Sequence, residues 1–195
     1  MLFHWNSCYQ KKILDRNFYL QPCTSVAKSL LWKYLVREIW NLLLVWKIIE
    51  TEAYLWRDDA ASHTYIGKTH RNKSCYEDWW VAYIHSMRQY CLLDVVTESW
   101  DIPSSVLIRA CEVIDGIDIM MTNRNTLDLK NMLNGPWKIC KAMNITKSMD
   151  WIDLTNTEWW LYIVDLQDSK NLSIIETTRI WISKSKELPL RFIVW

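Results

Sequence analysis

Glycine is nearly missing from this chain of 195 residues, which contains only three. Average usage of about 7% would give roughly 14 glycines at this length. Because glycine adopts positive φ angles without a steric penalty, a chain this poor in glycine has few easy solutions for tight turns. The scarcity excludes collagen-like and glycine-rich low-complexity proteins. The chain instead contains 14 tryptophans, an excess that needs an explanation.

Long apolar runs are also missing. The most apolar stretch, residues 30–49, is interrupted by Lys33, Arg37, Glu38 and Lys47, so it contains no run of about 18 apolar residues that would span a membrane. The N-terminus shows no basic segment followed by an apolar one. We therefore expect an intracellular protein, located in the cytoplasm or nucleoid, or in the nucleus of a eukaryote.

Cysteine pairs at the spacing of a metal site are absent. None of the six cysteines forms a CxxC pair or has a histidine pair at zinc-finger spacing, which predicts reduced and mostly buried thiols. A disulfide framework is not expected at this size and composition. The cysteines are Cys8, Cys23, Cys75, Cys91, Cys111 and Cys140.

A strong net charge is likewise missing, since the formal value is +1. Two local clusters of basic residues are nevertheless present. Taken on charge alone, they are better interpreted as a solvated loop and a solvated helix face than as a nucleic-acid surface. The first contains Lys68, His70, Arg71 and Lys73, and the second Lys138, Lys141 and Lys147.

The order of the apolar segments predicts one α+β domain over residues 1–195, with a curved antiparallel sheet and surrounding helices. Thr24 or Ser25 is expected to cap a short helix. Helical character is also predicted after the middle of the chain, with Pro136 at a first-turn position. The expected strands are two within 34–55 around Asn41, others within 81–97 and 104–113, and two near Tyr162 and Ile180; the expected helices are 114–121, 127–133 and 136–143.

The segment Glu50-Thr51-Glu52-Ala53-Tyr54 is the most informative for function. In a strand, Glu50, Glu52 and Tyr54 would share one face. An exposed face with solvated carboxylates is an equally good interpretation of this spacing. Arg109 is a charge inside an expected strand, and if buried it needs a carboxylate or phosphate partner.

The chain resembles the alkyladenine (3-methyladenine) DNA glycosylase family over residues 18–193. The resemblance rests on several motifs in the same order along the chain. These are Ile48-Ile49-Glu50-Thr51-Glu52-Ala53-Tyr54-Leu55, Asp59-Ala60-Ala61-Ser62-His63, Gly67-Lys68-Thr69 with Arg71-Asn72, Val106-Leu107-Ile108-Arg109-Ala110, Asn134-Gly135-Pro136 and Arg179-Ile180 before Ile182-Ser183.

The resemblance implies a monofunctional enzyme that removes alkylated or deaminated purines, such as 3-methyladenine, from double-stranded DNA after base flipping. Glu52 would activate water against C1′ of the flipped nucleotide, and Arg109 would hold Glu52 or a phosphate. Tyr54, His63 and Tyr83 would line the base pocket. No metal or organic cofactor is implied, and neither is a lysine Schiff base with strand nicking. We expect a monomer without a membrane partner.

Two family features do not align directly. The aromatic wedge that fills the DNA stack matches Ser86 or Met87, and Met87 is preferred because it is apolar. The pocket asparagine of the family matches Leu93 or Asp94, and Asp94 is preferred. Contacts to the DNA backbone are expected from Lys68, Arg71 and Lys138.

The resemblance also links the shortage of glycine to the excess of tryptophan. Where relatives have glycine or another small residue, this chain has Trp32, Trp46, Trp56, Trp137 and Trp181. An indole at such a site would introduce strain or overpacking of about 1–3 kcal/mol. An alternative hypothesis is therefore a catalytically impaired member that binds damaged DNA, or one that folds poorly. A sugar hydrolase that uses Glu50 and Glu52 is disfavoured, because both carboxylates would lie on one side of the substrate.

Overall fold

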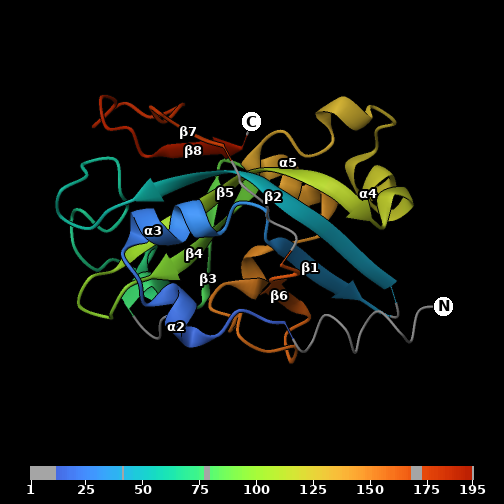
Figure 1. The fold of residues 1–195 in the computed structure, drawn as a ribbon, viewed down its shortest axis with the longest axis horizontal. Helices are drawn as coiled ribbons and strands as arrows, with labels where there is room; N and C mark the ends of the chain where they lie inside the picture. Colours follow the sequence, from blue (N-terminus) through green and yellow to red (C-terminus); the bar gives the residue numbers. More distant parts are fainter. Residues whose placement is uncertain (1–11, 41, 77–79, 168–172, 195) are drawn as a thin grey trace.

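The computed structural model describes residues 12–40, 42–76, 80–167 and 173–194, and its centre is an antiparallel sheet (Figure 1). The strand order is β3-β4-β5-β2-β1-β6, with β8 next to β2 and β7 next to β8. The longest strand, β2, pairs with β5 along one edge and with β1 and then β8 along the other. The strands are β1 Tyr34–Ile39, β2 Leu42–Tyr54, β3 Ala82–Met87, β4 Tyr90–Thr97, β5 Ser104–Asp115, β6 Leu161–Val164, β7 Ile174–Thr177 and β8 Arg191–Val194.

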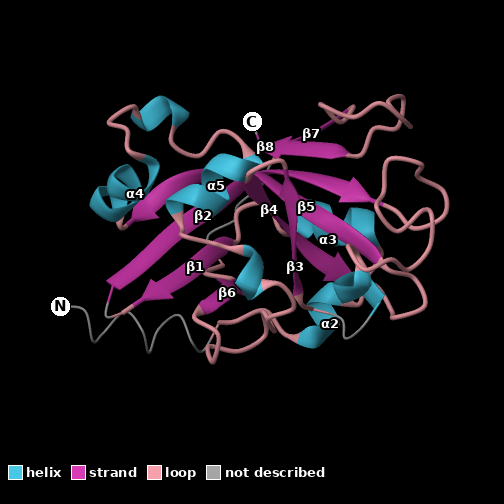
Figure 2. Ribbon diagram, turned by 180° about the vertical axis from the view of Figure 1, so that it is seen from behind, coloured by secondary structure: helices cyan, strands magenta, loops and turns pink. Residues whose placement is uncertain are grey.

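Short helices cover both faces of the sheet. The helix α3 lies in front of the sheet in Figure 1, whereas α5 is in front when the molecule is seen from behind in Figure 2. On the α3 side, the Thr51 hydroxyl donates to the Ala27 carbonyl oxygen at 2.8 Å, which ties α3 to β2. The helices are α2 Arg16–Tyr19, α3 Cys23–Ser29, α4 Ile117–Arg124 and α5 Pro136–Ala142, with 3-10 turns at Lys73–Tyr76, Leu129–Asn131 and Lys147–Met149.

The α+β class and most of the expected strands are confirmed. Two strands lie on either side of residue 41, which itself is outside the described residues. The segment 81–97 forms the hairpin β3–β4, and 104–113 lies within β5. Pro136 occupies the first turn of α5, where its missing N–H has no helical partner to lose.

Several local predictions are wrong, each for a local reason. The helix α3 begins at Cys23 after Pro22, without a side-chain cap from Thr24 or Ser25. Ile114 extends β5, and the helix begins only after Gly116, whose φ of 85° breaks the strand. The segment 127–133 contains only a 3-10 turn, in which the Asp128 carboxylate accepts from the Asn131 N–H. The strand expected near Ile180 is β7, Ile174–Thr177; Ile180 itself lies after it, and its amide binds the Glu52 side chain.

The cysteines follow the expected pattern where the structure describes them. Cys23, Cys75, Cys111 and Cys140 are buried free thiols, and Cys91 is partly buried and also free. Cys8 lies outside the described residues. Across the described ranges, no helix is both long and apolar enough to cross a bilayer.

Six tryptophans adopt φ angles between 56° and 77°, in the left-handed region that favours glycine. Of the five tryptophans that stand where relatives have glycine or another small residue, only Trp32 and Trp181 belong to this group. Trp46 is instead fully buried, with its Nε1 2.8 Å from the Met120 sulfur. The left-handed tryptophans are Trp32, Trp40, Trp80, Trp151, Trp160 and Trp181.

Candidate active site

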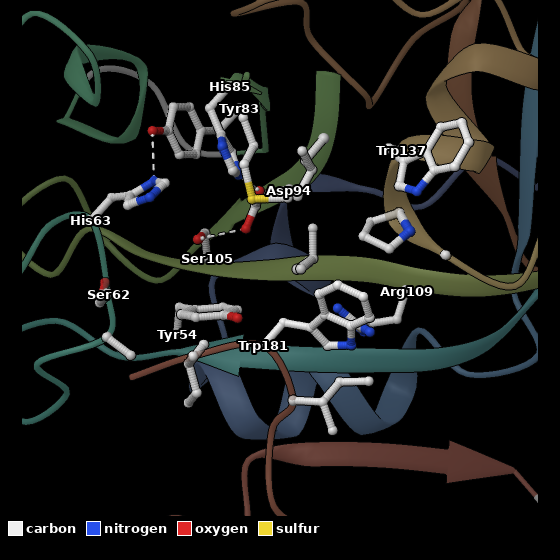
Figure 3. Close-up of a pocket in the computed structure, with 18 of the residues that line it drawn as sticks. Tyr54, Ser62, His63, Tyr83, His85, Asp94, Ser105, Arg109, Trp137 and Trp181 are labelled. Carbon is white, nitrogen blue, oxygen red and sulfur yellow. Dashed lines mark hydrogen bonds and ion pairs between the residues drawn. The ribbon is translucent and has the colours of Figure 1, made fainter. Parts of the chain in front are cut away.

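A cavity of about 370 Å³ opens on the face of the sheet opposite α3, over β3, β4 and β5 (Figure 3). Its remaining walls come from the loop after β2, the start of α5 and the segment between β7 and β8. The lining combines aromatic rings with a small number of polar groups, which is typical of a small-molecule site. The lining side chains include Tyr54, His63, Tyr83, His85, Met87, Asp94, Ser105 and Arg109.

Glu52 lies on β2 with its side chain fully excluded from solvent, and it contacts Tyr54, Arg109 and Ile180, which line the cavity. Its Oε2 accepts from the Tyr54 hydroxyl at 2.9 Å, and its Oε1 accepts from the Ile180 N–H at 3.0 Å. The guanidinium Nε of Arg109 is 3.6 Å from Oε1. Burial raises the pKa of Glu52, and the positive charge of Arg109 opposes that rise.

Arg109 also contacts the second carboxylate of the strand. Its Nε donates to Glu50 Oε1 at 3.3 Å, and the same oxygen accepts from Arg191 Nε of β8 at 2.6 Å. Arg109 is almost completely buried, so its charge requires these partners. The hypothesis of an exposed, solvated strand face is therefore wrong, because both carboxylates are held in an ion-pair network.

Three aromatic side chains form one wall. The His63 Nδ1 lies 3.0 Å from the Tyr83 hydroxyl, and the His63 ring meets His85 edge to face with centroids 4.6 Å apart. Tyr83 and His85 stack at 5.1 Å. Burial, with a smaller contribution from His85, lowers the pKa of His63 to about 4. His63 is thus a neutral ring at pH 7, suited to packing against a flat ligand.

Asp94 of β4 contributes a carboxylate to the same cavity. The Ser105 hydroxyl donates to its Oδ1 at 3.2 Å, and His85 Nε2 is 3.0 Å from its Oδ2. The neighbouring Leu93 faces the hydrophobic core. Of the two residues matched to the family's pocket asparagine, the structure therefore brings Asp94 and not Leu93 to the other site residues.

Met87 lies at the mouth of the cavity, at the end of β3, with 47% of its surface exposed. It pairs with Tyr90 across the two-residue turn of the β3–β4 hairpin. Ser86 points away from this cavity and lines a separate one, next to Arg71. The apolar candidate for the wedge is thus the one at the mouth.

The three basic residues expected at the DNA backbone are less closely grouped. Lys138 of α5 lines the cavity and donates to Asn134 at 2.5 Å. Arg71 donates to the Ser86 carbonyl oxygen at 3.2 Å from the loop before β3. Lys68 is exposed on the same loop and does not line the cavity. The indoles of Trp137 and Trp181 also lie at the mouth (Figure 3).

Sequence reasoning missed several residues that complete the site. His85 lies two positions after Tyr83, so strand alternation on that segment could have identified it. Ser105 and the Ile180 amide gave no comparable signal, because both contribute through tertiary contacts. Arg179 and Asp59 were noted only within motifs, yet they form a fully buried ion pair next to the cavity.

This arrangement suits a planar, electron-poor ligand above a buried carboxylate. The rings offer stacking surfaces, Asp94 offers hydrogen-bond acceptors, and Glu52 offers a basic oxygen. Among the residues that the structure describes, no group of three or more His, Cys, Asp or Glu side chains could hold a metal ion.

Comparison with known proteins shows matches over nearly the whole chain. The family model described as "Methylpurine-DNA glycosylase (MPG)" matches residues 17–195. A protein of Carboxydothermus hydrogenoformans named "Putative 3-methyladenine DNA glycosylase" is 40% identical over 182 residues, covering 92% of this chain and 94% of the relative. Relatives with the same name from Clostridium novyi (39%, covering 90% of both chains) and Francisella tularensis (37%, covering 86% and 88%) are similar.

Proposed function

This chain belongs to the methylpurine-DNA glycosylase family, and we propose that it releases alkylated purines such as 3-methyladenine from double-stranded DNA by hydrolysis of the N-glycosidic bond. The observation that carries this proposal is the position of Glu52, a buried carboxylate that contacts three residues in the lining of an aromatic cavity suited to a flipped base.

Glu52 acts as the general base. Its raised pKa makes it a stronger base than an ordinary carboxylate. Tyr54 occupies only one lone pair of Oε2, so the other can accept from a water that enters with the flipped nucleotide and attacks C1′. As the bond to the base breaks, positive charge develops on the sugar, and the carboxylate stabilises it.

Arg109 has a positioning role. It lies between Glu50 and Glu52, so its charge favours the ionised form of Glu52 and opposes the effect of burial on the Glu52 pKa. The Ile180 N–H fixes the orientation of the Glu52 carboxylate from the opposite side. Arg109 and the Ile180 N–H together orient the Glu52 carboxylate as the general base, and the reaction needs neither a metal nor a covalent intermediate.

The pocket favours a purine that has been damaged by alkylation. Tyr54, neutral His63 and Tyr83 present ring surfaces to the extruded base. An alkylpurine with a positive charge is attracted to these rings and is already a good leaving group. Met87 fills the gap left in the DNA stack, while Lys68, Arg71 and Lys138 bind phosphates on either side.

The enzyme is monofunctional and works as a monomer. Lys138 is the lysine that the structure places in the lining of the cavity, and its amine is engaged by Asn134. Hydrolysis by an activated water does not need a lysine Schiff base. Accordingly, borohydride should trap no covalent complex with DNA, and the abasic product should remain unnicked until alkali is added.

The test is base release from methylated duplex DNA by the purified chain. Glu52→Gln keeps the size of the side chain but removes the general base. The rate of purine release should therefore fall at least about 100-fold, which is within the usual contribution of general acid–base catalysis. Glu112→Gln, the same change at an exposed position of β5, is the control and should retain activity. Full release by Glu52→Gln would disprove the role of Glu52.

A second candidate function is binding of damaged DNA without turnover. It is favoured by Trp181, an indole at the mouth of the cavity with 90% exposure and a left-handed φ of 67°. If the indoles at residues 137 and 181 block the pocket, the chain will bind an abasic-site analogue yet release no base. Base release would then return in the Trp137→Gly/Trp181→Gly variant.

A further inference from the structure

The position of Asp94 bears on which purines the cavity accepts. It is 4% exposed, on the central part of β4, and its carboxylate faces the cavity (Figure 3). Its Oδ1 is satisfied by the Ser105 hydroxyl. Its Oδ2 has no aligned hydrogen-bond donor among the described residues, although His85 Nε2 lies 3.0 Å away. A buried acceptor atom without a donor, in the wall of a cavity, is a site for a ligand donor or a cation.

The groups around Asp94 leave its Oδ2 available to a ligand donor or a cation. His63 is neutral, since its pKa is lowered to about 4, and burial keeps the Tyr83 phenol protonated by raising its pKa. Arg109 also lines the cavity, but Glu50 and Glu52 already pair with it. His85 also faces Asp94, and its Nε2 is close to Oδ2 without the alignment of a hydrogen bond.

A carboxylate and an amide at this position differ in what they recognise. An ionised aspartate only accepts hydrogen bonds, whereas an asparagine both donates and accepts. An acceptor-only group attracts a cationic ring and an exocyclic amine. It repels a neutral ring that presents a carbonyl oxygen in the same place, because two acceptors would then face each other in a buried site.

We propose that Asp94 is a specificity-determining residue that restricts the pocket to cationic alkylpurines and rejects neutral deaminated purines such as hypoxanthine. This inference rests on the proposed glycosylase function and narrows it, since deaminated purines are removed from the expected substrates. Ser105 is a positioning residue that holds the carboxylate with Oδ2 toward the base.

The experiment compares release of 3-methyladenine and of hypoxanthine from matched duplexes by the wild-type chain and by Asp94→Asn. Because cationic bases leave faster in any environment, the informative quantity is the change in the ratio of the two rates. Asp94→Asn should lower the ratio of methylated to deaminated release by at least about 10-fold. Asp58→Asn, which removes an exposed carboxylate outside the cavity, should leave the ratio unchanged.

A second variant separates the charge of Asp94 from its contact with His85. His85→Gln retains a side-chain amide near Oδ2 but cannot become positively charged, so the preference for the cationic base should persist. An unchanged ratio in Asp94→Asn, with a melting temperature close to wild type, would overturn the proposal.

Binding of free ligands tests the pocket even if the chain releases no base. The probes are 7,9-dimethyladeninium, which is a cation at pH 7, and neutral hypoxanthine, measured by calorimetry with the wild-type chain. We expect the cation to bind at least about 10-fold more tightly, and this difference to vanish in Asp94→Asn. Equal binding of both probes by the wild type would overturn the role of Asp94. Absence of base release with intact discrimination would instead contradict only the proposed catalytic function.

Discussion

Arg179 and Asp59 form an ion pair in which both side chains are completely buried, with two guanidinium nitrogens facing two carboxylate oxygens. The same guanidinium donates to the Ala53 carbonyl oxygen at 2.9 Å, and the Asp59 carboxylate also accepts from the amides of Leu55 and Ala61. The pair therefore joins the end of β2, the loop that leads to His63 and the segment that contains the Ile180 amide.

Removing one partner of this pair should be severely destabilising. Arg179→Met leaves the Asp59 charge buried and uncompensated, which costs about 3–5 kcal/mol. We expect a fall of roughly 6–20 °C in melting temperature for a chain of this length. Lys186→Met, which removes an exposed charge from the same segment, should change the melting temperature little. The double variant Arg179→Met/Asp59→Leu should recover part of the loss, and no recovery would argue against the buried charge as the cause.

The loss of base release at low pH should follow the protonation of Glu52. Since the carboxylate is the active form and burial raises its pKa, base release should decline with falling pH earlier than for an ordinary carboxylate. Arg109 lowers that pKa, so Arg109→Gln should move the decline to still higher pH. The measurement is single-turnover base release across pH for both proteins. A profile whose midpoint does not move in Arg109→Gln would show that Arg109 does not tune Glu52.

His63 should make folding stability depend on pH. Its pKa is about 4 in the folded chain and about 6.5 in an unfolded one, so between these values the unfolded state binds the extra proton. The free energy of unfolding therefore falls as pH drops from 6.5 toward 4. Denaturant unfolding at pH 7 and pH 5 should show a smaller difference in His63→Phe than in the wild type. His70→Phe, at an exposed position, should retain the wild-type difference.

The tryptophans should respond to replacement by glycine in two opposite ways. Trp40 and Trp181 are 94% and 90% exposed and have left-handed φ angles, so glycine relieves backbone strain of about 1–3 kcal/mol with little packing to lose. Trp40→Gly/Trp181→Gly should raise the melting temperature. Trp46→Gly should lower it, because a fully buried indole leaves a cavity worth about 3–5 kcal/mol or more. A change in melting temperature of the same sign in both variants would contradict this prediction.

The sequence pattern predicted those elements whose structure depends on residues close to one another in the chain. The alternation around Glu52 and the apolar block of β2 located the central strand and its acidic face. The predicted cap of α3 was wrong because Pro22 precedes the helix. The strand expected near Ile180 ends at Thr177, and the Ile180 amide binds Glu52 instead. Contacts between distant segments, such as Ser105 with Asp94 and Arg179 with Asp59, leave no periodic signal in the sequence. They become evident only when the chain is folded.

The tryptophans with left-handed φ have a consequence at the level of translation. The triplet TGA encodes tryptophan in some genetic codes and glycine in others. Six indoles with glycine-like backbone angles, in a chain with three glycines, are the pattern expected when TGA codons meant for glycine are translated as tryptophan. The gene should then contain TGA at residues 32, 40, 80, 151, 160 and 181. Peptide mass spectrometry of the protein from its own host should accordingly find glycine at each of these positions.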